Sequence, residues 1–294
     1  MLKKAPSGFW ARIALFAAAI IWGSSFIFLK DSLGFMPPNY LIAIRFSGAF
    51  VLLSLIFIRK YKDFTADYLW RGAIIGFFIF AAYSIQTIGL QSTTPGVNAF
   101  LAGMYSVFVP FMLWALKCGK PDRYNIIAVC LSTVGAGLVM LKSGFSVEKG
   151  DLLSLNAAIM FALHIVMVEK FGKNKDMIMI TIMQFLFAAV YSWITAFIFE
   201  KPVFGDINWF KLAYLSVFCT AIALLFQNVG QKLTNPSASS IILSLESVFG
   251  IIISMLLGYE TLSLRSAIGF TMIFCAVVVS ETKLSFLRKK NVNN

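Results

Sequence analysis

The segments QTIGLQSTTP at residues 86–95 and QNVGQKLTNP at residues 227–236 share Gln, Gly, Thr and Pro at the same places, 141 positions apart. Extending the alignment without gaps pairs residues 86–128 with 227–269, where nine of 43 positions are identical. Composition alone gives roughly three identities over such a length. The chain therefore carries an internal duplication.

A second, weaker match extends the duplication towards the start of each half. At an offset of 139, Trp22 falls on Phe161 and Arg45 falls on Gln184. Repeats of this kind predict two related structural units. We expect them at residues 11–141 and 150–282, followed by a basic cytoplasmic tail at 283–294.

Around these segments the chain is strongly apolar. Hydrophobic residues make up 59% of the 294 positions, charged residues only 13%, and the mean hydropathy is +0.83. A soluble domain carries roughly 25% charged residues, whereas a membrane-spanning helix needs about 20 apolar ones. We therefore predict an all-α integral membrane protein. Its ten transmembrane helices are expected near residues 11–29, 37–58, 69–90, 95–116, 124–141, 150–169, 177–199, 208–229, 236–257 and 264–282.

The net charge of +12 raises the question of a nucleic-acid partner. The basic residues lie between the apolar runs, which is typical of membrane topology, so we expect a lipid bilayer and no nucleic acid around the protein. Eighteen of the 25 Lys and Arg residues fall on one side of the ten-span arrangement and six on the other, with Arg45 inside a span. Because basic residues concentrate in cytoplasmic loops, both termini are expected to be cytoplasmic.

The first apolar run, at residues 11–29, follows basic residues as a secretory signal does. It is too long for a signal, contains Trp22 and lacks a small-residue cleavage site, so we interpret it as the first span. The four cysteines are scattered, and no pair has the spacing of metal ligands. We expect no disulfide, no metal ion and no cofactor.

The number of spans in each half sets the relation between the halves. Five crossings return the chain on the opposite side, so two such halves in series have opposite orientations in the bilayer. Inverted repeats can exchange conformations, which opens a site between them first to one side and then to the other. The sequence therefore favours a transporter, and the alternative is that the duplication only builds a stable bundle.

Several short motifs add a family resemblance. They are WGSSFIFLK at 22–30, RF at 45–46, LESVFG at 245–250, and Gly258, Glu260 and Gly269 around the last two spans. With these motifs the chain resembles the drug/metabolite transporter superfamily, in particular its ten-span EamA-type permeases. The resemblance implies a basket of helices with a central cavity in the plasma membrane, and commonly export of metabolites or amino-acid-like solutes. Lys120 and Ser247 depart from the family pattern.

Two charged residues lie deep within predicted spans. Arg45 is about eight residues into span two and Glu246 about ten residues into span nine, which is roughly 12 to 15 Å from the span ends. A charge at that depth costs at least about 2.5 kcal/mol, so it should face a cavity or a partner. Glu246 is a candidate for binding a substrate amine or a proton, or for a structural ion pair. Arg45 is a candidate for substrate contact or for binding carbonyl oxygens. Whether the two pair is left open.

Other polar and aromatic residues within the spans are candidates for the lining of a cavity. His164, the single histidine, can shuttle protons, contact substrate or bridge helices. Gln86 and Gln227 are related by the repeat, so they are expected on opposite sides of one cavity, although glutamines also join helices. Pro110 is expected to kink span four. The remaining candidates are Trp22, Tyr83, Asn98, Tyr105 and Asn228.

The same residues bear on function classes other than a transporter. One histidine and no cluster of carboxylates argue against an intramembrane enzyme, and the missing G-x-x-x-x-G-K-[ST] loop argues against an ATP-driven pump. A passive channel or lipid scramblase stays an alternative. The prediction is a secondary transporter for a small-molecule solute, coupled or not to protons. The solute and the choice between monomer and homodimer are left open.

Overall fold

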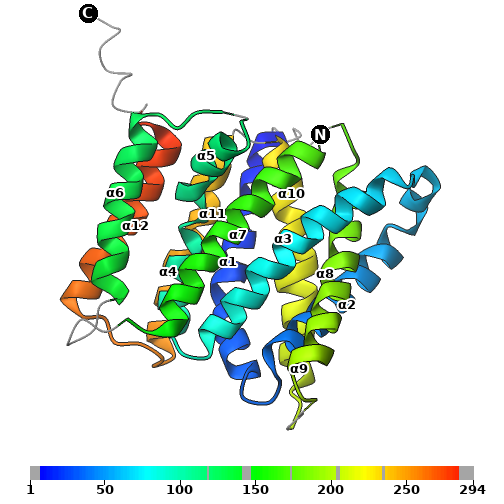
Figure 1. Cartoon of the computed structure of the whole chain (residues 1–294), viewed down its shortest axis with the longest axis horizontal. Helices are drawn as coiled ribbons and strands as arrows, with labels where there is room; N and C mark the ends of the chain where they lie inside the picture. The colour runs from blue at the N-terminus through cyan, green and yellow to red at the C-terminus, as the bar shows by residue number, and fades with distance from the viewer. Residues whose placement is uncertain are drawn as a thin grey trace, which may run out of the picture.

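Helices make up nearly all of the computed structural model, which describes residues 7–117, 119–140, 147–172, 174–202, 206–233 and 236–284 (Figure 1). The helices of the first half are α1 (Ser7–Ser32), α2 (Pro38–Ile56), the short 3-10 helix η1 (Ile58–Asp63), α3 (Asp67–Leu90), α4 (Pro95–Gly103), α5 (Tyr105–Ala115) and α6 (Arg123–Met140). Those of the second half are α7 (Lys149–Gly172), α8 (Met177–Phe199), α9 (Trp209–Ala213), the π-helix η2 (Tyr214–Ile222), α10 (Ala223–Leu233), α11 (Pro236–Leu256) and α12 (Leu264–Thr282).

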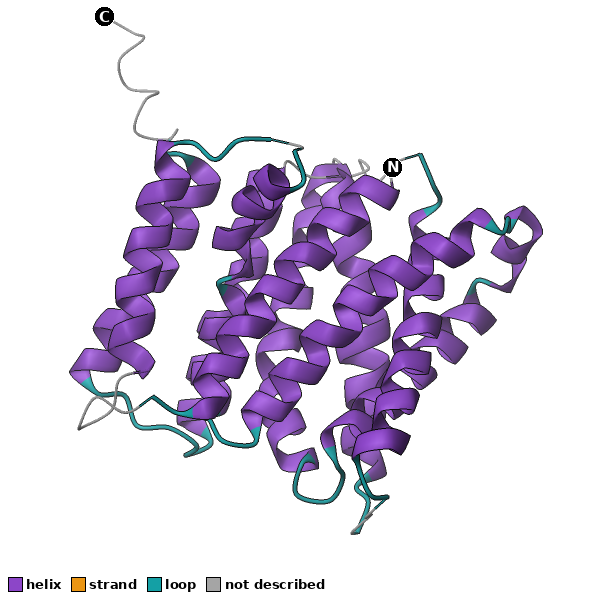
Figure 2. Cartoon of the chain, viewed as in Figure 1, coloured by secondary structure: helices purple, strands orange, loops and turns teal. Residues whose placement is uncertain are grey.

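The described part of the chain contains no strand (Figure 2). With α4 and α5 taken as one span and α9, η2 and α10 as another, nine helical spans there are long and apolar enough to cross a bilayer. The helix α11 has 21 residues, and Ile242–Leu256 is its apolar part. It occupies the place of the predicted ninth span. The prediction of an all-α, multi-span membrane protein is confirmed.

Two of the spans are not continuous α-helices. Span four is interrupted at Met104, between α4 and α5, where the amides of Met104 and Val107 bond three residues back, 3.3 and 3.0 Å from their acceptors. This interruption lies about a turn and a half before Pro110, which sits inside α5, and the sequence did not predict it. A kink at Pro110 itself stays a prediction. Span eight contains the π-helix η2, which the apolar pattern does not predict.

The helices pack in pairs that correspond between the two halves (Figure 1). The helix α1 packs on α10 and α11, and its counterpart α7 packs on α3 and on the α4–α5 span. The helix α3 also packs on α8, and its counterpart span, through η2, packs on α2. The pairs α2–α8, α4–α11 and α6–α12 each join a helix to its own counterpart. The two halves therefore make equivalent contacts.

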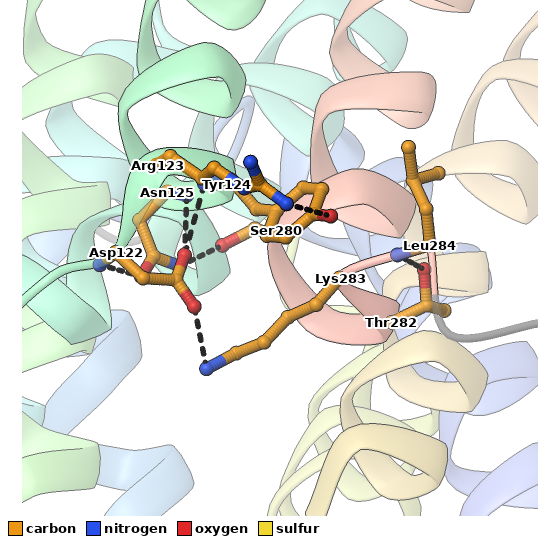
Figure 3. Close-up of polar contacts among 8 residues, drawn as sticks. All are labelled: Asp122, Arg123, Tyr124, Asn125, Ser280, Thr282, Lys283 and Leu284. Atoms are coloured by element: carbon orange, nitrogen blue, oxygen red, sulfur yellow. Dashed lines mark hydrogen bonds and ion pairs between the residues drawn. The ribbon is translucent and has the colours of Figure 1, made fainter. Parts of the chain in front are cut away.

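One of these pairs, α6 with α12, forms an edge of the bundle (Figure 1). A side-chain carbon at Gly135 or Gly269 would lie 2.8 Å from the carbonyl oxygen of the other glycine, so the two backbones touch. Above this contact Lys283 pairs with Asp122 at 2.7 Å, and the Asn125 amide donates to Ser280 at 3.0 Å (Figure 3). Polar contacts thus fix the end of a pair whose middle is held by close backbone packing.

The start of α1 and the end of α12 lie at the same end of the bundle, drawn at the top of Figure 1. An even number of spans requires this arrangement. Which side of a membrane that end faces stays a prediction from the basic residues. Of the expected basic tail, residues 285–294 lie outside the described part of the chain.

Candidate functional site

A cavity lies between α1, α3, α4, α5, α7, α10 and α11. Its lining combines aromatic, amide and carboxylate side chains. The lining residues are Trp22, Ser25, Phe26, Ile79, Tyr83, Gln86, Ala102, Tyr105, Phe161, His164, Ile165, Leu224, Gln227 and Glu246.

Seven of the ten residues singled out from the sequence line this cavity. They are Trp22, Tyr83, Gln86, Tyr105, His164, Gln227 and Glu246. The other three, Arg45, Asn98 and Asn228, are buried between helices outside it. Their roles in binding or coupling stay predictions.

Most lining residues come in pairs related by the internal duplication. At the offset of 139, Trp22, Ser25 and Phe26 correspond to Phe161, His164 and Ile165. At the offset of 141, Tyr83, Gln86 and Tyr105 correspond to Leu224, Gln227 and Glu246. Twelve of the fourteen lining residues are therefore six pairs, and the cavity lies where the two halves meet.

Glu246 is the one Asp, Glu, Lys or Arg among the lining residues. Its side chain is buried, with 7% exposure, and its carboxylate has no hydrogen-bond or ion-pair partner within the described part of the chain. The helix α1 packs closely against the turn of α11 that carries Glu246 because position 23 is glycine. A side-chain carbon at Gly23 would lie 2.5 Å from Cβ of Phe249 and 3.1 Å from the Glu246 carbonyl oxygen. The sequence thus places a bare carboxylate at a close helix crossing.

Aromatic rings form part of the cavity wall, and their neighbours hold them in place. The indole of Trp22 donates to the Cys219 carbonyl at 2.8 Å. The ring of Phe161 meets Tyr83 edge to face, with centroids 5.2 Å apart, and lies 6.2 Å from the ring of Tyr105. Rings fixed in this way form a preorganised apolar surface.

Arg45 lies behind this wall. Its guanidinium stacks on Tyr83, 4.5 Å from the ring centroid, and only 1% of the residue is exposed. Its Nε donates to Thr220 at 2.5 Å and its Nη2 to the Cys219 carbonyl at 3.4 Å, so it binds the π-helix η2. Nη1 has no partner in the described chain, and no ion pair joins Arg45 to Glu246 there. These contacts match the expected alternative of an arginine that binds a helix carbonyl.

Hydrogen bonds between helices account for the other buried polar candidates. His164 Nε2 lies 3.0 Å from Gln184 Oε1, which joins α7 to α8. The Asn98 amide donates to Ser154 at 2.7 Å and to the Gln86 carbonyl at 3.2 Å. The Asn228 amide donates to Thr181 at 2.5 Å. Asn98 and Asn228 thus hydrogen-bond neighbouring helices to each other around the cavity.

A set of polar contacts links the halves at the end of the bundle where α1 ends and α9 begins, at the bottom of Figure 1. Lys211 on α9 pairs with Asp31 on α1 at 2.6 Å. Tyr259, from the loop after α11, donates to Asp31. This bond to Asp31, with burial, raises the pKa of Tyr259 to about 12. Lys30 donates to the Leu90 carbonyl at 2.6 Å, which caps the end of α3.

A second contact at this end joins α4 to the loop after α11. Thr94 donates to Glu260 at 2.9 Å, and Ser254 donates to it at 3.2 Å. Burial raises the pKa of Glu260, although these hydrogen bonds oppose the shift. Its carboxylate sits at the start of α4, where negative charge is favoured by the helix dipole.

No group of three or more His, Cys, Asp or Glu side chains is placed to hold a metal ion among the described residues. The cavity itself offers one carboxylate and one imidazole. Its side chains are suited to holding a polar organic molecule by hydrogen bonds, ring contacts and one negative charge.

A multi-span helical protein with a cavity where two related halves meet has the architecture of a membrane transporter. The profile of the EamA-like transporter family matches residues 9–141 and again residues 148–282, so the chain belongs to that family. The family expected from the sequence motifs is confirmed.

Relatives of the chain carry transporter names. An uncharacterized transporter of Archaeoglobus fulgidus is 30% identical over 284 residues, which cover 94% of this chain and 87% of the relative. The uncharacterized inner membrane transporter YedA of Escherichia coli K12 is 27% identical, over 90% of this chain and 89% of its own. A solved crystal structure at 15% identity covers 96% of this chain and 99% of that one with a TM-score of 0.68, which shows the fold.

Sequence reasoning did not select several of the lining residues. Ser25, Phe26, Ile165 and Leu224 lie in uniformly apolar or small-residue stretches that carry no signal of their own. The duplication does carry one, because each is the repeat partner of another lining residue. Ile79 and Ala102 have no such partner in the lining, and no feature of the sequence singles them out.

Proposed function

We propose that the protein is a secondary transporter that exports a small metabolite or amino-acid-like solute across the plasma membrane by alternating access through the central cavity. The observation that carries the proposal is the lining of that cavity by six repeat-related pairs of residues. A site at the junction of two related halves can be reached from either side as the halves exchange conformations. A relative, YedA, is named an inner membrane transporter, which supports the location.

The packing supports an inverted relation of the two halves. Contacts of α1 with α10 and α11 are matched by contacts of α7 with α3 and the α4–α5 span. Each half contributes an odd number of spans to this pattern. With the excess of basic residues on one side, the termini are assigned to the cytoplasm.

Ion pairs join the two halves at both ends of the bundle. The pair Asp31–Lys211 lies where α1 ends, which the charge count assigns to the outer face. At the other end Lys60 pairs with Asp176, and Lys175 pairs with Asp67 at 2.6 Å. In alternating access, opening the outer face would separate Lys211 from Asp31, and opening the inner face would separate the other two pairs.

Glu246 is assigned the central binding and coupling role. A buried carboxylate without a partner is stabilised by taking up a proton or a cation. A site that binds one or the other can exchange them across the membrane, which would couple export to the proton gradient.

Flux into proteoliposomes tests the proposal. Vesicles with the purified protein would be offered a panel of metabolites chosen by comparing cells with and without the gene. We expect saturable uptake of at least one solute, faster than in protein-free vesicles and unaccompanied by ohmic current. An ohmic current, or lipid scrambling without solute flux, would replace the transporter with a channel or a scramblase.

The coupling role has its own test in the same vesicles. We expect Glu246→Gln to insert and fold normally but to lose the stimulation of transport by a pH gradient. The matched control is Glu169→Gln, which removes an exposed carboxylate from α7. Equal stimulation in the Glu246→Gln variant would remove the proton from the mechanism.

A further inference from the structure

The charge of the central cavity points to one class of solute. Among its fourteen lining residues Glu246 supplies the single full charge, and neither lysine nor arginine is present. The nearest arginine, Arg45, is separated from the cavity by the ring of Tyr83 and uses its Nε and Nη2 on Thr220 and Cys219. The space open to a solute is therefore negative when Glu246 is ionised and neutral when Glu246 holds a proton.

The cavity also provides the surface that organic cations favour. Five aromatic side chains line it: Trp22, Phe26, Tyr83, Tyr105 and Phe161. Aromatic faces attract ammonium groups through the ring quadrupole, and they bury an apolar body at the same time. Rings beside one carboxylate thus match a molecule with one cationic end and an apolar remainder.

A carboxylate on the solute finds no lysine or arginine in the lining. The donors there are the amides of Gln86 and Gln227, hydroxyl groups, the indole of Trp22, which is already bonded to Cys219, and the imidazole of His164, whose Nε2 is already bonded to Gln184. A zwitterion would bring a second negative charge close to Glu246 in a buried space without a cation to balance it. Such an unpaired charge is costly to desolvate.

We propose that the cavity binds an organic monoamine in its cationic form, with the ammonium at Glu246 and an apolar body against the rings of Trp22, Tyr83 and Phe161, in preference to the corresponding amino acid. This inference rests on the proposed transport function and narrows its solute class. It separates amines from the amino-acid-like solutes that the family resemblance leaves open.

Three probes with one shared ring test the preference: phenethylamine, phenylalanine and phenylacetate. Binding to the purified full-length protein would be measured by calorimetry in detergent at pH 7. We expect phenethylamine to bind at least tenfold more tightly than phenylalanine, and phenylacetate not to bind. Phenylalanine or phenylacetate binding as tightly as phenethylamine, or no binding of phenethylamine, overturns the inference.

Variants assign the binding to the cavity. We expect Glu246→Gln to weaken phenethylamine binding at least tenfold and Tyr83→Leu, which copies Leu224 of the other half, to weaken it severalfold. Glu169→Gln, on an exposed site, should leave the affinity unchanged. Thermal unfolding checks that each variant is folded, and a folded Glu246→Gln protein with unchanged affinity contradicts the proposal.

Flux separates this inference from the transport proposal. Phenethylamine that binds but does not cross proteoliposomes leaves the amine site in place and removes the transport function. Saturable flux of phenylalanine without flux of phenethylamine leaves the transport function in place and removes the amine preference.

Discussion

The two halves of the protein give the central cavity equivalent positions but unequal chemistry. Gln86 and Gln227 occupy corresponding positions of the repeat and are identical. At another pair of corresponding positions the first half has Tyr105 and the second half has Glu246. The second half also supplies His164 where the first has Ser25. Duplication thus preserved the scaffold of the cavity, while a single acid, on one half, supplies its carboxylate.

Copying the first half onto the second at this acid should have the largest effect. Glu246→Tyr gives both halves a tyrosine, and we expect it to reduce transport by roughly tenfold or more, since one charge interaction worth about 1.4 kcal/mol accounts for a factor of ten. Flux in proteoliposomes measures it. The reciprocal Tyr105→Phe should keep at least half of the flux; a stronger loss there than at Glu246 would reverse the comparison.

The next comparison concerns Arg45 and its repeat partner Gln184. Arg45 binds the π-helix through Thr220 and the Cys219 carbonyl, whereas Gln184 binds His164. We expect Arg45→Gln to lower the free energy of unfolding by about 1.5 to 3 kcal/mol, the usual worth of hydrogen bonds to a charged group. Thermal unfolding in detergent measures it. Unchanged stability would mean that Arg45 does not hold η2 in place.

The next comparison concerns Gly23 on α1 and its repeat partner Ala162 on α7, which lie at corresponding helix crossings beside the cavity. A side-chain carbon at Gly23 would come within 2.5 Å of Cβ of Phe249, so Gly23→Ala should push α1 from α11. Overpacking of this kind costs about 1 to 3 kcal/mol. Gly137→Ala is the control, because nothing lies within 4 Å of its side-chain position. Equal unfolding temperatures for the two variants would argue against the close crossing.

The smallest effect is expected where α6 and α12 begin. Asp122 accepts from the backbone amides of Tyr124 and Asn125 (Figure 3). Its repeat partner Ser263 accepts from the backbone amide of Ser266 at 3.1 Å. Burial works to raise the pKa of Asp122, but the Lys283 hydrogen bond and these amides hold it below its ordinary value.

A lowered folded pKa means that the stabilisation by Asp122 is present above its unfolded pKa, about 3.9, and is lost as the pH falls through the folded value. Because Asp122 contributes a helix cap and a partly exposed ion pair, the loss in the free energy of unfolding should stay below about 1 kcal/mol. Unfolding of the Asp122→Ser variant, followed from pH 6 downward, should lack this part of the acid dependence. A variant whose stability falls with acid as steeply as the parent would contradict it.

The sequence predicted the helices well because each is a long apolar run between charged or helix-ending residues. It predicted the orientation of side chains less well. In a membrane protein the lipid-facing and inward faces of a helix are both apolar, so periodicity does not tell which face of a span is buried. Glu246 and the paired glutamines could be selected because polarity within a span is costly, whereas Phe26 and Leu224 could not.

Local backbone geometry was also beyond the sequence pattern. Arg45 was predicted from depth alone to face a cavity or a partner, and its partner is a π-helix whose extra residue leaves no mark on composition. The interruption of span four at Met104, and not at Pro110, likewise depends on packing around α4 and α11. Only the tertiary arrangement defines such positions.

The pairing of α6 with α12 bears on how the protein is made. The helix α6 leaves the ribosome five spans before α12, so the backbone contact of Gly135 with Gly269 forms only after the whole second half has entered the membrane. Until then α6 has little but lipid for a neighbour along that face. A chain stopped before residue 264 would leave the glycine face of α6 without its packing partner.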